Sequence, residues 1–257
     1  MPPIEFFVVY AALVGLIVGS YLNVVVHRLP HQQSTVVPRS RCPQCGAAIR
    51  VRDNLPVLSW LLLRGRCRDC GARISVRYPL IELLTAALFA GAVLRFGVTP
   101  TAAACALFSA ALLALAAIDV EHFLLPDRIT LPGIGLALAA QPLLVWGSLA
   151  GALQGALVGA GILLVMAGLW ELLRGVEGMG LGDVKMLAMI GAFLGVHGVV
   201  VTLVFASFAG SVVGITLLAR GSIELQGKLP FGLFLALGGA IALFAGEPLT
   251  RAYLALL

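Results

Sequence analysis

Long apolar runs recur from one end of the chain to the other, and they constrain its fold more than any other feature. Eight runs can be marked out, at 4–26, 80–96, 101–118, 129–146, 149–173, 184–196, 199–219 and 230–245. A helix needs about 20 predominantly apolar residues to cross the hydrocarbon core of a bilayer. Only 11% of the 257 residues are charged, about half the share found in soluble domains. We therefore expect an all-α polytopic membrane protein with about eight transmembrane helices.

The run at 184–196 is the least certain of these spans. Its residues would rise only about 20 Å as a helix, whereas the hydrocarbon core is about 30 Å thick. Either the helix extends beyond these bounds or the backbone is irregular at this depth. Irregular backbone is tolerated inside a membrane only where protein or water covers it.

Positive charge is concentrated in one segment. Ten arginines and two acids lie between Arg28 and Arg77, while the whole chain carries a net charge of +5. Basic loops beside a span stay in the cytoplasm, so this segment is expected there and the N-terminus outside. The positive charge therefore indicates the topology of the chain and not a binding site for nucleic acid. The expected surroundings of the spans are membrane lipids.

Two identical cysteine motifs stand in this basic segment. Each has the pattern C-x-x-C-G, and 21 residues separate Cys45 from Cys67. The four thiols are Cys42, Cys45, Cys67 and Cys70. Four thiolates complete a closed tetrahedral zinc site, and the spacing is close to that of zinc ribbons. Disulfides or a redox pair are alternatives, but a cytoplasmic loop lies in a reducing compartment. We expect a structural zinc ion in a zinc-ribbon-like domain after the first helix.

Three aspartates stand at the predicted ends of spans on the cytoplasmic side, at Asp119, Asp127 and Asp183. Asp183 ends a glycine-rich turn and is followed by Lys185. The glycines of this turn are Gly178, Gly180 and Gly182. The glycines indicate a bend, positive φ angles or close approach of another group. Two facing carboxylates can divide acid and base roles across a water molecule. Alternatively, Asp183 pairs with Lys185 or caps the next helix, and Asp127 is a turn and cap residue.

The ordered motifs resemble the type IV prepilin peptidases, which belong to the GxGD group of membrane aspartic proteases. The resemblance runs nearly from end to end of the chain. Besides the cysteine motifs, it rests on GSYLNVVVHRLP at 19–30, RDNLPVLSWL at 52–61, RYPLIE at 77–82, ID at 118–119 with LPD at 125–127, GMGLGDVK at 178–185, and PFG at 230–232 followed by FLALG at 234–238. One departure is visible, because Leu233 stands where the family often has a second proline.

The resemblance implies that Asp119 and Asp183 are the catalytic pair, supported by the glycines, Asp127 and Lys185. Family members cut the leader of prepilins and pseudopilins after a glycine at the cytoplasmic face of the inner membrane. Many then methylate the new N-terminal residue with S-adenosylmethionine, and the four-cysteine domain accompanies these bifunctional members. No glycine-rich nucleotide fingerprint of the soluble methyltransferases is visible in this chain. The substrates serve pilus assembly or protein secretion.

The implied organisation has three parts. These are a first transmembrane helix at 1–26, a cytoplasmic zinc-binding domain at 27–79 and a transmembrane peptidase bundle at 80–257. Two other classes of protein are alternatives. A transporter would carry acids near the middle of its spans, whereas the acids here cluster at span ends. A non-catalytic assembly factor would not need both Asp119 and Asp183.

Overall fold

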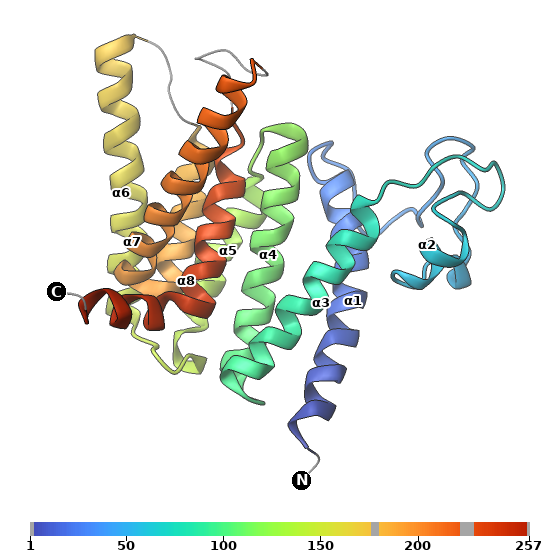
Figure 1. Cartoon of the computed structure of the whole chain (residues 1–257), viewed down its shortest axis with the longest axis horizontal. Helices are drawn as coiled ribbons and strands as arrows, with labels where there is room; N and C mark the ends of the chain where they lie inside the picture. Colours follow the sequence, from blue (N-terminus) through green and yellow to red (C-terminus); the bar gives the residue numbers. More distant parts are fainter. Residues whose placement is uncertain (1–2, 176–179, 222–228, 256–257) are drawn as a thin grey trace. The chain divides into compact units, whose positions relative to one another are not determined.

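The computed structural model describes residues 3–175, 180–221 and 229–255. Within these ranges the protein is helical, and the only β pairing is two isolated bridges. The chain divides into two compact units, Met1–Ala114 and Leu115–Leu257 (Figure 1). The boundary falls inside a helix, so it does not test the predicted division at residues 26 and 79, which stays a prediction.

Six helices of the described part are long and apolar enough to cross a membrane. They are α1 (Ile4–Arg28), α3 (Arg77–Phe96), α4 (Pro100–His122), α6 (Leu149–Arg174), α7 (Leu181–Ala219) and α8 (Phe231–Leu254). The polytopic all-α prediction is confirmed, but a count of eight spans is not. The count differs because the predicted span at 129–146 is a shorter helix, and because α7, counted here as one helix, contains both the predicted runs 184–196 and 199–219 on either side of a break at Gly195.

In the first unit, α1 and α3 pack as an antiparallel pair. A Cβ on Gly15 would lie 2.7 Å from the Cα of Ala86, and one on Gly19 would lie 2.7 Å from the Cα of Glu82. Glycine at these two positions therefore lets the helix backbones come close, as is common between transmembrane helices. At the far end of the pair, the buried Asn23 donates from Nδ2 to the carbonyl oxygen of Tyr78 at 3.1 Å.

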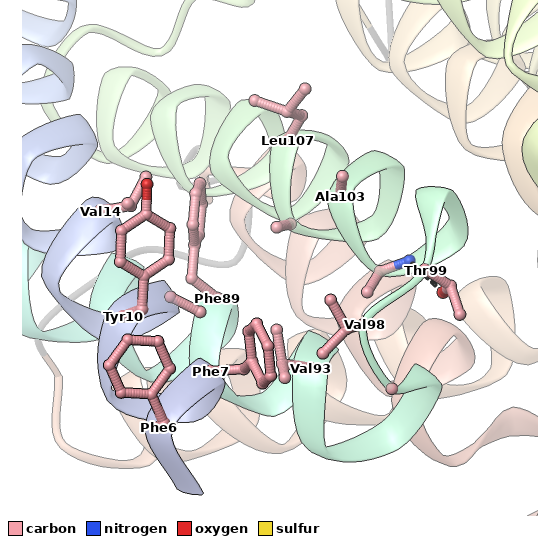
Figure 2. Close-up of a pocket in the computed structure, with 14 residues that line it drawn as sticks. Phe6, Phe7, Tyr10, Val14, Phe89, Val93, Val98, Thr99, Ala103 and Leu107 are labelled. Carbon is pink, nitrogen blue, oxygen red and sulfur yellow. Dashed lines mark hydrogen bonds between the residues drawn. The ribbon is translucent and has the colours of Figure 1, made fainter. Parts of the chain in front are cut away.

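An apolar cavity of about 580 Å³ lies at the opposite end of this pair, where the start of α4 also contributes. Figure 2 shows Phe6 and Tyr10 of α1, Phe89 and Val93 of α3, and Leu107 of α4 around it. The apolar side chains that line this cavity suit contact with lipid tails.

Between α1 and α3 the chain forms two short helical turns, η1 (Val51–Asp53) and α2 (Leu58–Leu62), together with the cysteine motifs. The chain between α1 and α3 is thus largely irregular. Its contacts are described with the metal centre below.

In the second unit, the predicted span at 129–146 is a shorter helix, α5 (Asp127–Ala139), followed by a turn, η2 (Gln141–Leu143). The buried Gln141 satisfies the irregular backbone that follows the helix. Its Nε2 donates to the carbonyl oxygens of Ala137 and Ala192 at 3.1 and 2.9 Å, and its Oε1 accepts from the backbone of Ser148 at 3.0 Å. One side chain thereby connects α5, α7 and the start of α6.

The α7 helix is broken at Gly195, where φ is +71° and ψ is −175°. A Cβ on Gly191 would lie 2.8 Å from Cγ2 of Val199, eight residues later. In a straight helix, eight residues rise about 12 Å, so the chain folds back here into two arms. The gap between the two predicted runs was at 197–198, whereas the break lies at Gly195. The first arm begins at Leu181, three residues before the predicted start of the run at 184. Both explanations offered for the short run at 184–196 therefore hold.

Close contacts fix the directions of the neighbouring helices. On α6, Cβ atoms at Gly155 and Gly159 would meet the carbonyl oxygens of Gly191 and Leu187, so α6 is antiparallel to the first arm of α7. On α8, a Cβ at Gly238 would meet the carbonyl oxygen of Thr202. The α8 helix is antiparallel to the second arm, since Thr250 bonds His197 at 3.1 Å.

Candidate active site and metal centre

The two cysteine motifs fold as two copies of one turn. In the first, Cys42 donates its backbone N–H to Ala47, and Gly46 donates to Cys42. In the second, the same bonds join Cys67 to Ala72 and Gly71 to Cys67. Both glycines have φ of +71°, a conformation that glycine adopts without strain. Each motif therefore turns on its glycine.

The four sulfur atoms of Cys42, Cys45, Cys67 and Cys70 all lie within 4.8 Å of one another. The Sγ atoms of Cys42 and Cys70 are 3.8 Å apart. A zinc ion with sulfur ligands at 2.3 Å in a tetrahedron would separate them by about the same distance. The cluster can therefore hold a metal ion with four sulfur ligands, without rearrangement of that pair.

The protonation of the thiols also suits a cation. Backbone N–H groups of Cys45 and Gln44 lower the pKa of Cys42 to about 7. At Cys70 the backbone N–H of Ala72 favours the thiolate, but desolvation and the three neighbouring thiols outweigh it and raise the pKa to about 12. One of the four thiols ionises readily, but each further thiolate is repelled by the first. Four thiolates can therefore stand together only with a metal ion among them.

An ion pair ties the segment between the motifs to the second motif. Arg68 donates from Nε and Nη2 to the Asp53 carboxylate at 2.6 to 3.1 Å. These hydrogen bonds lower the pKa of Asp53 and raise that of Arg68. The two-pronged geometry fixes the orientation of both side chains.

In the second unit, Asp119 lies in the last turn of α4 and is only 5% exposed. Its Oδ2 accepts the backbone N–H of Leu233 at 3.1 Å. Leu233 belongs to the first turn of α8, whose N–H groups have no partner within the helix and favour a negative charge. The carboxylate of one helix thus binds the amino-terminal end of another. The residue that departs from the family pattern supplies this bond, which proline could not donate.

Asp183 lies in the first turn of α7, and its backbone N–H donates to the carbonyl of Gly180 at 3.2 Å. Its carboxylate is near enough to Asp119 for the two charges to interact. The two aspartates predicted to form a pair, far apart in the sequence, are therefore neighbours in one unit.

The glycines of the turn differ in their surroundings. Gly178 lies outside the described residues. Gly180 has φ of −74°, so the positive φ considered for the turn does not occur there. A Cβ on Gly182 would lie 2.9 Å from Cβ of Leu125. In the part of the chain that the structure describes, a Cβ on Gly180 would meet only the nitrogen of Gly182, at 3.9 Å. Close approach, rather than unusual backbone angles, explains the glycine at 182.

Lys185 does not pair with Asp183. Its Nζ donates to both carboxylate oxygens of Asp127 at 2.7 and 2.8 Å. The alternative in which Lys185 neutralises Asp183 is therefore wrong. Asp127 begins α5 and Lys185 lies in the first arm of α7, so this ion pair joins the starts of two helices beside the aspartates.

Three residues of the site were not singled out as contributors from the sequence, namely Leu125, Gly232 and Leu233. Leu125 is buried, and both Gly182 and Gly232 approach it within 2.9 Å, measured from an added Cβ. Gly232 also leaves room for Asp119, because an added Cβ would lie 2.9 Å from its Oδ2. The motifs LPD and PFG marked this region, but an apolar side chain and a backbone N–H carry no chemical signature in a sequence.

Family models match two parts of the chain. The bacterial peptidase A24 N-terminal domain matches residues 13–96, and the type IV leader peptidase family matches residues 106–215. A prepilin leader peptidase/N-methyltransferase of Burkholderia pseudomallei (strain 1026b) is 43% identical over 270 residues, covering 93% of this chain and 85% of that protein. The chain belongs to the type IV leader peptidase family.

Other members of the type IV leader peptidase family match at similar levels. The prepilin leader peptidase/N-methyltransferase of Pseudomonas aeruginosa is 41% identical over 271 residues, covering 96% of this chain and 93% of that protein. The protein of the same name from Stutzerimonas stutzeri is 39% identical over 284 residues, covering 99% and 98%. No solved structure matches this chain. The resemblance inferred from the ordered motifs is confirmed.

Proposed function

We propose that this protein is a membrane aspartic endopeptidase that removes the leaders of prepilins and pseudopilins, using Asp119 and Asp183. The placement of these two carboxylates carries the proposal. They come from the end of α4 and the start of α7 and interact with each other in one unit. The names of the relatives, prepilin leader peptidase/N-methyltransferase, supply the substrate class and the second activity.

The proposed chemistry needs one ionised and one protonated carboxyl group. The ionised carboxylate takes a proton from a water molecule, and the resulting hydroxide attacks the carbonyl carbon of the scissile bond. The protonated group donates its proton to the carbonyl oxygen. As the peptide bond breaks, the proton taken from water passes to the leaving amine, and the proton on the former carbonyl oxygen returns to the carboxylate that donated it. Like charges held close together favour this shared single proton. The N–H of Leu233 holds Oδ2 of Asp119 in place during these steps.

The substrate would lie with its apolar helix in the bilayer and its cleavage site, after a glycine, at the membrane surface. Both aspartates lie at the ends of membrane-spanning helices rather than at their middles. This placement suits a cut next to an apolar segment and argues against a transporter. The turn before Asp183 can admit an extended peptide, because among the described residues Gly180 has little around it.

The second proposed activity is methylation of the new N-terminal residue with S-adenosylmethionine as donor. The four-cysteine cluster would hold a zinc ion through Cys42, Cys45, Cys67 and Cys70. With four protein ligands the ion has no open position, so it would stabilise the domain and supply no catalytic chemistry.

The proposed location is the inner membrane, with the zinc domain and active site in the cytoplasm and the N-terminus outside. The arginines between Arg28 and Arg77 support this orientation. The proposed division is a first helix at 1–26, the zinc domain at 27–79 and the peptidase bundle at 80–257.

Conservative substitutions test the aspartate pair. Asp119→Asn and Asp183→Asn should each lower the cleavage of a prepilin in purified membranes by about a thousandfold or more. Glu171→Gln, which removes an exposed carboxylate at the end of α6, should cleave normally. Normal processing by either aspartate variant, at matched amounts of inserted protein, would refute the pair.

Mass measurement tests the methylation separately. Purified protein is incubated with a prepilin and isotope-labelled S-adenosylmethionine, and the mass of the mature product is measured. One labelled methyl group on the new N-terminus is expected. A cleaved but unlabelled product would contradict the transferase proposal and leave the peptidase proposal intact.

A further inference from the structure

The α2 helix turns its leucines away from the segment that carries it. Leu58, Leu61 and Leu62 are 58%, 57% and 80% exposed, and Leu55, just before the helix, is 50% exposed. Ser59 is only 7% exposed. Residues three and four positions apart share one side of a helix, so Leu58, Leu61 and Leu62 lie on one side of α2. Together with Leu55, these exposed leucines are named here the leucine face. A helix on a soluble domain has the reverse arrangement, with its apolar side buried.

Hydrogen bonds on the inner side of α2 hold it in this orientation. Ser59 donates from Oγ to the carbonyl of Arg52 at 3.1 Å and accepts the backbone N–H of Leu55 at 2.9 Å. Trp60 donates from Nε1 to the carbonyl of Ile74 at 3.2 Å. Turning the leucines inward would break all three bonds, so the exposure of the leucine face is built into the segment.

A further contact sets the level of α2 relative to the membrane. The backbone N–H of Val57, the residue before α2, donates to Oε2 of Glu82 at 2.7 Å. Glu82 is 6% exposed and lies in α3, about 7.5 Å along the helix from Arg77. The headgroup layer of one leaflet is about 5–8 Å thick. With the Arg77 guanidinium at the level of the headgroups, this contact would place α2 near the boundary between headgroups and hydrocarbon. Figure 1 shows α2 level with the α3 ribbon rather than beyond its end.

Charged residues beside α2 match the same environment. Arg52, Arg64 and Arg66 are exposed and flank the helix in sequence. Arginines near a membrane attract anionic lipids, and leucines combined with arginines are typical of helices that lie in the interface.

We infer that the leucine face docks into the leaflet next to Arg28 and Arg77, with anionic lipid headgroups as the partner of the flanking arginines. The four-cysteine segment is then attached to the bilayer surface at a third point, besides α1 and α3. This inference goes beyond the proposed activities and requires neither of them.

Photocrosslinking in the full-length, zinc-loaded protein tests the docking. The photoreactive residue p-benzoylphenylalanine replaces Leu62, and in a matched control it replaces Gln44, an exposed polar residue of the first cysteine motif. Each variant is reconstituted in vesicles of phosphatidylglycerol and phosphatidylcholine and illuminated. The adducts are identified by mass spectrometry, and the metal content confirms that each variant is folded.

Lipid adducts at Leu62 should exceed those at Gln44 several-fold. In vesicles of phosphatidylcholine alone, the yield at Leu62 should fall by about fivefold, because the arginines lose their anionic partners. Equal lipid yields at the two positions would overturn the inference. So would adducts at Leu62 that join only protein, whether the second unit of the chain or another copy.

Discussion

At the scale of single residues, two glycines of one motif have different tasks. Gly182→Ala should lower kcat/KM for prepilin cleavage by about tenfold or more, because its Cβ would lie 2.9 Å from Cβ of Leu125 and push Asp183 away from Asp119. Gly180→Ala should stay within about twofold of wild type, since its Cβ would meet only one atom, at 3.9 Å. Cleavage kinetics in detergent solution measure both. Equal losses in the two variants would contradict this assignment.

The backbone N–H of Leu233 is a second feature at this scale. Leu233→Pro removes the hydrogen bond to Asp119 while keeping a residue that the first turn of a helix tolerates. We expect kcat/KM for cleavage to fall by about two- to tenfold, the net value of one such bond.

Leu233→Ala is the matched control, because it shortens the side chain and keeps the N–H. Its cleavage rate should follow that of wild type. If alanine and proline had the same effect, the side chain rather than the hydrogen bond would be responsible.

At the scale of elements, the break in α7 depends on one residue. Gly195 has φ of +71° and ψ of −175°, a conformation open essentially to glycine alone. Gly195→Ala should therefore destabilise the folded protein by about 1–3 kcal/mol. Thermal unfolding in detergent measures the loss.

Gly161→Ala provides the comparison for this prediction. Gly161 lies within α6, and an added Cβ would have no heavy atom within 4 Å. Its unfolding temperature should equal or exceed that of wild type. A Gly195 variant as stable as the Gly161 variant would show that the break is not under conformational constraint.

The helices themselves were predictable because an apolar run of sufficient length has few alternatives in a membrane. Their irregular parts were not. The sequence has glycine at both 195 and 198, and the helix breaks at Gly195. The choice depends on tertiary packing, such as the approach of Gly191 to Val199, which a sequence does not show. The orientation of α2 was missed for a similar reason. The hydrogen bonds of Ser59 and Trp60 that turn its leucines outward cannot be read from the sequence.

At the scale of the whole molecule, the five cysteines should fall into two reactivity classes. A bound metal ion protects the four clustered thiols, and chelation should release all four to a thiol reagent. Cys105, which is 0% exposed within α4, should react only after unfolding. A thiol titration in detergent, before and after chelation and then in denaturant, counts each class.

The cysteine variants sharpen this titration. Cys105→Ala should leave the number released by chelation at four, whereas Cys42→Ser should lose the metal. Four thiols that react before chelation, or an unchanged metal content in the Cys42 variant, would contradict a metal centre.

The candidate site could be predicted as far as its charged and sulfur-bearing groups. The cysteine spacing and the two aspartates follow from chemistry and from ordered motifs. The partner of Lys185 could not be chosen from the sequence, because Asp183 is adjacent and Asp127 is distant. In the structure, Lys185 binds the distant Asp127. Leu125 was equally inaccessible, because its role depends on glycines from two other helices meeting it.

The break at Gly195 also bears on how the protein enters the membrane. The first arm of α7, from Leu181 to Gly195, is about 21 Å long, too short to cross a hydrocarbon core of about 30 Å by itself. The two arms should therefore leave the insertion machinery together, as a hairpin, instead of one after the other. In that order of events the start of the hairpin remains on the side from which it entered. The carboxylate of Asp183 then never has to pass through the lipid.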